Sequence, residues 1–443
     1  MKISNISTKL RWIGVTVLLA MFQTVSAQQT LTLKQAIEFA LQNKADAQKA
    51  KLELQRGDLK IKEAKAGALP QISASGGIQY NAIIQETALE MNDQLMVIRM
   101  GQPWNTNAAV SVYQNLFDQR VFTGLKAAKS TREFYQINAQ LTDEQVIERV
   151  ATAYYQVFVT EQKLKNVDAS FENTTKVKNV IQSLFNNGLA KEIDLDRTNV
   201  GLVNIQSTRQ QILNAVQLQE NALKFYMGMP IETEIELVED EVKINEYLIE
   251  DKFDYTKRTE VAAVLKQKEL LGYNLEATKA ALYPTVGLAA NYGINGFGQN
   301  FPLHNSTYWS NVASIALQVK VPIFTGGATK SKIAQAQLDI DALDIDIKDM
   351  LLGLDLEYNN AKTQIENLIV NLKNQQENVT LAEKVFNNTQ ANYQHGLANL
   401  TEVIDAEQAY TEAKNNYSNV LLEYKVAEVA LLKARGELNT IIQ

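Results

Sequence analysis

The chain of 443 residues contains no cysteine. This absence excludes a disulfide framework, a thiolate metal site and lipid attachment through an N-terminal cysteine. Histidine is nearly as scarce, because only His304 and His395 occur and neither has a second nitrogen or sulfur ligand nearby in the sequence. We therefore expect no metal, no cofactor and no catalytic residues.

Long apolar runs are also missing after residue 27, so no segment approaches the roughly 20 apolar residues that a membrane-spanning helix needs. Before that point, Lys2, Lys9 and Arg11 precede the apolar run Trp12–Phe22, and the small residues Val25–Ala27 follow it. This pattern predicts a cleavable secretory signal over residues 1–27. Its removal takes three of the 43 basic residues and none of the 50 acidic ones, which leaves a formal charge of −10 and argues against nucleic acid as a partner.

Two pairs of segments alternate apolar and polar residues with a period of two, which is typical of strands that have one apolar face. The first pair covers residues 71–81 and 108–117, and the second covers residues 285–295 and 313–321. The sequence therefore predicts two β-hairpins, with strands of about nine to eleven residues.

Long loops, roughly Ala82–Thr106 and Gly296–Asn311, join the strands of each hairpin, and Trp104, Tyr308 and Trp309 sit close to them. Strands of this length with long loops at one end and aromatic residues at their ends are typical of β-strands that span a membrane. Four such strands cannot close a barrel, because about eight are the practical minimum. Open edges are not tolerated in lipid, so several copies of the chain must close the barrel if these strands span a membrane.

Apolar residues that recur every seven positions are typical of long helices that supercoil around partner helices. One such row consists of Leu351, Tyr358, Ile365, Leu372, Val379, Phe386 and Tyr393. A matching row about 208 positions earlier includes Val150, Val157, Leu164, Phe171 and Phe185. The two rows predict a duplicated chain built from helical rods.

Continuous helices are predicted from about Val121 to Asn186 and from about Ala328 to His395. Each is near 100 Å long at about 1.5 Å per residue. Gly188 ends the first helix and Gly396 the second, and a shorter returning helix follows each glycine. Each half is thus predicted to contain an antiparallel helical hairpin.

The duplication predicts four segments along the chain. Residues 1–27 are the signal peptide, 28–230 the first structural repeat, 231–255 an acidic connector and 256–443 the second structural repeat. Each repeat is expected to hold a helix, two strands and the long helical hairpin.

The opening helices of the repeats are expected over Thr32–Ala66, with Thr32 as the N-cap, and over about Thr256–Leu282. In the connector, apolar and acidic residues alternate from Ile231 to Leu237, which favours a short strand or a belt segment outside the rods.

Several motifs, taken in their order along the chain, resemble the TolC-type outer membrane efflux protein family. In the second half they are the strand-to-helix corner Val321–Gly327, the turn Tyr393–Leu397 that leads into Glu402–Ala406, and the end segment Leu431–Leu438. The first half carries looser versions: Asn115–Asp118, Asn187–Ala190 leading to Asp194, and Leu223–Gly228. The resemblance covers essentially the whole chain after the signal.

The resemblance implies a mainly α fold with a membrane β-barrel, formed by a homotrimer in which three chains supply four strands each to a twelve-stranded barrel. Below the barrel, an α-helical tunnel would cross the periplasm from the outer membrane. It further implies a passive exit duct of a tripartite export system, which docks on a periplasmic adaptor and an inner membrane pump.

The two glycine turns are candidate adaptor contacts. If the long loops lie outside the cell, both turns lie at the far periplasmic tip, where the family contacts its adaptor. The candidates are Gly188, Leu189, Ala190, Gly396, Leu397 and Ala398. The alternative is that each glycine only supplies the positive φ of a helix end.

Three residues match gate positions of the family, namely Tyr393, Glu402 and Asp405. Three copies of Glu402 and Asp405 would gather six carboxylates on the pore axis, which favours cations. The alternative is that these acids belong to an ordinary solvated helix face. At Ala398, better-known members carry a basic residue that ties the closed state together, so that contact is absent or built differently in this chain.

Two other functions compete with the duct. A periplasmic adaptor also contains a long coiled hairpin, but the paired amphipathic strands speak against it. An enzyme is the remote third possibility: the segment Gly326–Ser331 lacks the glycine before lysine that a phosphate-binding loop requires. The exported substrate cannot be read from the sequence.

Overall fold

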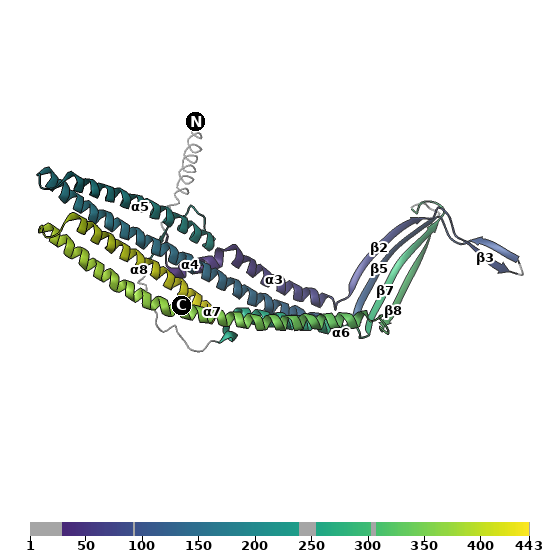
Figure 1. Ribbon diagram of the computed structural model, residues 1–443. Coiled ribbons are helices and arrows are strands. Elements are labelled where there is room, and N and C mark those ends of the chain that lie inside the picture. Colours follow the sequence, from purple (N-terminus) through teal and green to yellow (C-terminus); the bar gives the residue numbers. More distant parts are fainter. Residues whose placement is uncertain (1–28, 92–93, 239–253, 303–306, 443) are drawn as a thin grey trace, which may run out of the picture. The chain divides into compact units, whose positions relative to one another are not determined.

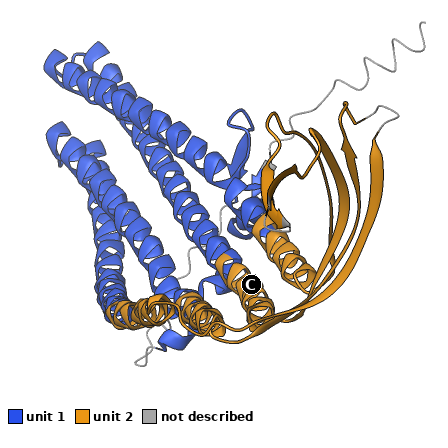
Figure 2. Ribbon diagram, turned by 90° about the vertical axis from the view of Figure 1, so that its right-hand side faces the viewer, with its two compact units in different colours: residues 1–51, 139–261, 350–443 blue, residues 52–138, 262–349 orange. Residues whose placement is uncertain are grey.

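The computed structural model describes residues 29–91, 94–238, 254–302 and 307–442. The predicted signal peptide, most of the acidic connector (239–253) and His304 lie outside these ranges. The chain divides into two compact units, the first formed by residues 1–51, 139–261 and 350–443 and the second by residues 52–138 and 262–349 (Figure 2). None of the described helices combines the length and the apolar character that crossing a membrane requires.

The long helices are α4 (Gln119–Asn186, 68 residues) and α7 (Ala328–Gln394, 67 residues). Each is followed by a returning helix of 36 residues, α5 (Glu192–Met227) after α4 and α8 (Leu400–Arg435) after α7 (Figure 1). The predicted helical hairpins are therefore confirmed.

The heptad rows account for the packing of α7 against α8. Tyr358, Ile365 and Leu372 of α7 are buried in one cluster with Tyr424 and Leu431 of α8. Burying these side chains between two antiparallel helices removes apolar surface from water, which is the main force that holds such a pair together.

The four predicted strands form one antiparallel sheet in the second unit, with the order β2-β5-β7-β8. The strands are β2 (Gln71–Tyr80), β5 (Trp104–Phe117), β7 (Thr285–Gly298) and β8 (Tyr308–Lys320) (Figure 1). Within the described residues, β2 and β8 each have one edge without a partner strand.

One apolar face of this sheet is uncovered in the single chain. Ile315, Leu317 and Val319, which alternate along β8, are 81%, 62% and 60% exposed. A contiguous exposed apolar surface of this kind marks a contact with lipid or with another protein.

The predicted loop Ala82–Thr106 is wrong in part, because it contains a further hairpin of β3 (Glu86–Met91) and β4 (Gln94–Arg99). The strands pair in the register Glu86↔Arg99, and Arg99 Nε lies 2.8 Å from Glu86 Oε1. The apolar residues of β4 follow one another as Leu95–Ile98 without alternating, so a search for period two does not find this strand.

The predicted helix Thr32–Ala66 is also corrected, since it is divided into α2 (Leu33–Asn43) and α3 (Ala45–Ala66). Thr32 is the N-cap of α2, as expected, and accepts a hydrogen bond from the Gln35 amide. At Lys44 the backbone is extended (ψ 132°), and Lys44 Nζ donates to the Phe225 carbonyl oxygen at 2.9 Å. The helix therefore does not continue through Lys44, and the Lys44 side chain contacts α5 instead.

Short segments from distant parts of the chain complete the first unit. Strand β1 (Gln29–Leu31) pairs in parallel with β6 (Ile235–Leu237), which agrees with a short strand in the connector. The 3₁₀ helix η2 (Tyr255–Lys257) also belongs to the first unit, whereas helix α6 (Thr259–Ala280), which follows it, lies mostly in the second unit; the two helices occupy the predicted segment Thr256–Leu282. A last 3₁₀ helix, η3 (Leu438–Ile442), packs near α2 and contributes Leu438 to the main core.

Gly228 is where the end of α5 meets the junction of α2 and α3. Its φ is +74°, and a Cβ atom there would lie 2.9 Å from the Asn43 carbonyl oxygen. We expect Gly228→Ala to lower the free energy of unfolding by about 2 kcal/mol, because strain and a backbone clash add together. Gly188→Ala is the matched control, since Gly188 has φ +72° but open space around it. Thermal unfolding of both variants tests this; equal losses would show that the close approach does not matter.

Glu161 of α4 lies among other charges in the first unit. Burial raises the pKa of its carboxyl to about 7; the negative charges of Glu220 and Glu236 contribute to the rise and Lys165 opposes it. Because the folded state holds this proton more tightly than the unfolded state, Glu161 makes the protein less stable as the pH rises from about 4.5 to about 7.

Glu161→Gln removes that ionisation. We expect the variant to unfold roughly 2 °C higher than the parent at pH 8 and to differ little from it at pH 4. Glu172→Gln, which changes an exposed carboxylate on the same helix, should leave both temperatures unchanged. Scanning calorimetry at the two pH values measures the difference, and a gain of equal size at both would rule out the titration of Glu161 as its cause.

Candidate functional site

The two predicted tip turns have the same backbone geometry. Gly188 follows α4 with φ +72°, and Gly396 follows α7 with φ +73°. The next amide closes each turn on the helix end: Leu189 N donates to Leu184 O and Leu397 N donates to Asn392 O, both at 2.8 Å. This arrangement satisfies the last carbonyl groups of the helix and requires a left-handed residue, which explains the glycine.

Each turn presents one apolar side chain to solvent. Leu189 is 75% exposed and Leu397 is 78% exposed, whereas Ala190 and Ala398 are half-buried. Figure 1 shows both turns at the same end of the helices. Two exposed leucines on matching turns are suited to docking a partner, because their burial would be favourable.

Behind the turns, side chains from both helical hairpins form one apolar cluster, called here the tip cluster. Its buried members are Val177, Ile181, Phe386, Leu400, Val403 and Ala406, against which Ala190, Leu195, Tyr393, Ile404 and Tyr410 pack. The rings of Phe386 and Tyr410 stack with centroids 5.9 Å apart. The two hairpins therefore hold each other through this cluster at the end where the turns lie.

Tyr393 joins this cluster at the end of α7. Burial, and then the negative charge of Asp194, raise the pKa of the Tyr393 phenol above its ordinary value. Asp194 lies in the first turn of α5, so this interaction connects the second hairpin with the first. Tyr393 is a candidate gate residue from the sequence, which did not predict Asp194 as its neighbour. The recurrence of the turn motif in both halves could have indicated it, because the motif places the two residues at the same end of the helices.

Glu402 and Asp405 both lie exposed on the first turns of α8, at the spacing that puts two side chains on one helix face. Asn399, the N-cap of α8, accepts from the Glu402 amide at 3.0 Å and donates from its own Nδ2 to Glu402 Oε1 at 2.7 Å. A carboxylate near a helix N-terminus is also favoured by the helix dipole. Glu402 thus has a local structural role besides any role in a pore.

A second contact between the hairpins lies close to the turns. Arg197 Nη1 of α5 donates to Thr401 Oγ1 of α8 at 3.4 Å. Ala398 carries no charge that could form such a contact. In the described part of the chain, no cluster of three or more side chains could hold a metal ion.

Comparison with known proteins finds relatives whose sequences match most of the length of this chain. It is 21% identical to the outer membrane protein TolC of Vibrio cholerae, over 86% of this chain and 84% of the relative. It is also 21% identical to the proteases secretion protein PrtF of Dickeya chrysanthemi, over 93% of this chain and 89% of the relative. Neither relative is named as an enzyme.

Solved structures agree with the fold. The outer membrane protein VceC of Vibrio cholerae superposes with a TM-score of 0.72 at 18% identity, covering 91% of this chain and 96% of VceC. The Campylobacter jejuni CmeC outer membrane channel gives a TM-score of 0.72 at 15% identity, covering 92% of this chain and 86% of CmeC.

The family described as "Outer membrane efflux protein" matches residues 36–229 and 256–437. These two ranges contain the two helical hairpins, the sheet strands and both turns, and they leave out the connector between the repeats. With a mainly helical fold shared with solved outer membrane channels and a family match over most of its length, the chain belongs to the outer membrane efflux protein family.

Proposed function

We propose that this outer membrane efflux protein works as a passive exit duct, which opens and closes at the tip turns. Its family and relatives make it an outer membrane channel of an efflux or secretion system, and they do not support the adaptor alternative. A passive duct supplies no energy for transport, so the protein controls export only through the opening of its tip.

The duct consists of three copies. Each copy has a four-stranded sheet with an uncovered apolar face, and among the described residues no strand pairs with the outer edges of β2 and β8. Unpaired edges cannot persist in lipid, and four strands are too few to close on themselves. Pairing β8 of one copy with β2 of the next removes every edge and gives a cylinder of twelve strands. This open-edged, apolar sheet is the observation that carries the proposal.

The two repeats, residues 28–230 and 256–443, contribute equivalent hairpins to the helical wall, and residues 231–255 connect the two repeats along the sequence. The long helices α4 and α7 differ by one residue in length, and the returning helices have equal lengths. Hairpins whose helices have nearly equal lengths are suited to a wall in which every position is occupied by a similar hairpin.

The tip turns contact the other proteins of the export system. Gly188, Leu189 and Ala190 with Gly396, Leu397 and Ala398 form the surface for a periplasmic adaptor, and an inner membrane pump supplies the energy for transport. The exposure of both leucines supports this assignment. Tyr393, Glu402 and Asp405 form the gate, with Tyr393 holding the hairpins together and the two acids facing the pore.

The test is extraction and reconstitution of the full chain. We expect the protein to require detergent, to have the mass of three chains and to conduct ions after insertion into a planar bilayer. A water-soluble monomer without conductance would overturn the proposal. A trimer that inserts but does not conduct would keep the assembly and reject the duct.

A further inference from the structure

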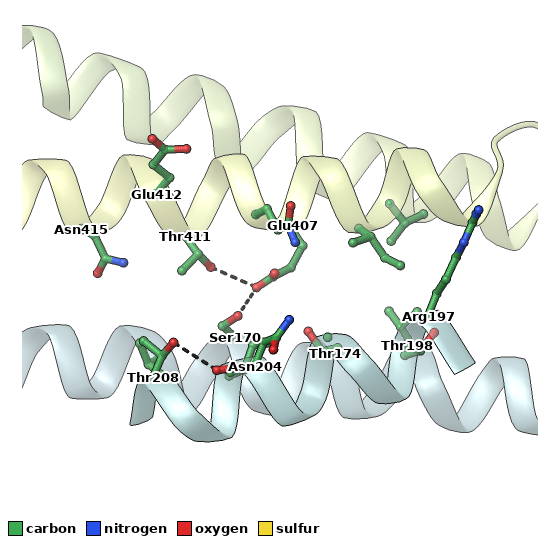
Figure 3. A pocket seen from close by; sticks show the side chains of 17 residues that line it. Ser170, Thr174, Arg197, Thr198, Asn204, Thr208, Glu407, Thr411, Glu412 and Asn415 are labelled. Atoms are coloured by element: carbon green, nitrogen blue, oxygen red, sulfur yellow. Dashed lines mark hydrogen bonds between the residues drawn. The ribbon is translucent and has the colours of Figure 1, made fainter. Parts of the chain in front are cut away.

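A cavity of about 310 Å³ lies beside the tip cluster, between α4 and α5 of the first hairpin and α8 of the second. We call it the inter-hairpin cavity (Figure 3). Its floor is buried and includes Val167, Val177 and Val403, whereas Asn204, Gln408 and Glu412 at its mouth are exposed. A cavity of this size accommodates a small organic molecule.

A carboxylate stands on the floor of this cavity. Glu407 of α8 is 8% exposed, and its Oε1 accepts hydrogen bonds from Ser170 Oγ of α4 and from Thr411 Oγ1, the latter at 3.0 Å. Figure 3 shows Glu407 reaching from α8 towards Ser170. Both hydroxyl donors are directed at one oxygen, and within the described residues no group donates to Oε2.

Glu407 also lacks an opposite charge, which separates it from the other buried Asp, Glu, Lys and Arg side chains that the structure describes. Those are paired: Asp118 with Arg120, Lys224 with Glu220, Arg258 with Glu260 and Glu357, and Lys425 with Glu428. No cationic side chain of the described ranges lies within ion-pair distance of Glu407. A buried charge without a partner is unfavourable, and a bound cation would remove that penalty.

The rest of the lining favours a cation as well. The lining contains two carboxylates, those of Glu407 and Glu412, but only one guanidinium, that of Arg197, which already donates to Thr401. Asn415 Oδ1 is a buried acceptor that finds no hydrogen-bond partner among the residues that the structure describes. The cavity therefore offers unsatisfied acceptors next to apolar walls.

We propose that the inter-hairpin cavity binds a small organic ammonium ion, whose charged nitrogen lies against Glu407 and whose apolar part packs on the valines. A metal ion fits less well, because Glu407 is the only carboxylate on the floor among the described residues and the space is far larger than an ion. The site is part of the helical hairpins of a single chain and does not depend on the proposed duct.

The test compares two ligands of equal size on the detergent-solubilised full-length protein. The 2-phenylethylammonium ion carries the charge, and 2-phenylethanol replaces the ammonium group by a neutral hydroxyl. Isothermal titration calorimetry at pH 7 should give a dissociation constant about tenfold lower for the ammonium ion. Equal affinities, or no binding of either ligand, would overturn the proposal.

The variant Glu407→Gln tests whether Glu407 causes the preference for the ammonium ion over the alcohol. Glutamine keeps an oxygen that accepts from Ser170 and Thr411 but has no charge, so the tenfold preference should disappear. Glu423→Gln, the same change at an exposed position of α8 outside the cavity, should retain it. A preference that survives Glu407→Gln rejects the site even if the wild-type protein binds the ion.

Ion conductance of the same preparation separates this inference from the proposed function. A protein that conducts but binds neither ligand loses only the cavity proposal. One that prefers the ammonium ion but does not conduct loses only the duct.

Discussion

The double variant Glu402→Gln/Asp405→Asn is expected to lower the preference of the channel for cations over anions by roughly a factor of three, with a change in single-channel conductance. In the proposed trimer, the two positions would bring six carboxylates to the tip, and their field would attract cations into the channel. The amide variants keep the local structure, since the oxygen of a glutamine at 402 still accepts from Asn399. Reversal potentials under a salt gradient in planar bilayers measure the preference.

Ionic strength provides the control for this experiment. Exposed charges are screened over about 10 Å at 0.1 M salt and over about 3 Å at 1 M, so the difference between variant and parent should shrink as salt increases. Glu423→Gln changes an exposed charge far along α8 and should leave the reversal potential unchanged. If the double variant has the parent's conductance and reversal potential at low salt, Glu402 and Asp405 are not gate residues.

Tyr393→Ala is expected to produce longer and larger channel openings. The ring packs against the tip cluster that joins the two hairpins, and its removal weakens that contact by about 2 kcal/mol in each chain. Tyr393→Phe keeps the ring and removes only the hydroxyl, which interacts with the negative charge of Asp194, so it should change the channel openings less than Tyr393→Ala does. Single-channel recordings of open lifetime and conductance distinguish the three proteins.

Leu381→Ala is the matched control for Tyr393→Ala. Leu381 also lies on α7, but it is 62% exposed and is not a member of the tip cluster. It should leave open lifetimes unchanged. If Tyr393→Ala behaves like Leu381→Ala, the contact between the hairpins does not control opening.

Local patterns in the sequence were sufficient to predict most of the elements. The heptad row from Leu351 to Tyr393 lies within α7, and the strands found by their period of two are those of the sheet. These patterns succeed because each long element buries or exposes a regular face along its whole length. They also explain why the ends of α4 and α7 agree with the prediction to within two residues.

The two errors have different causes: the strand β4 does not alternate apolar and polar residues, whereas the break between α2 and α3 depends on distant residues. Neither glycine nor proline stands near Lys44 to end a helix there. Instead, the Lys44 side chain donates to the Phe225 carbonyl oxygen of α5, and Gly228 approaches the same backbone. The turn glycines could be read directly, because a left-handed helix end needs them. The role of Glu407 could not be predicted from the sequence, because its burial and its lack of a counter-ion become apparent only when α4 and α8 are packed together.

The order in which the parts of the first unit occur along the chain affects how the protein is made. Leu31 shares the main core with Leu223 and Leu438, so that core draws on residues from near both termini. Neither unit is a single stretch of chain, and the first needs residues 350–443. The core of the first unit is therefore complete only once residues 350–443 are present, and until then part of its apolar surface stays exposed, which favours aggregation of the incomplete chain.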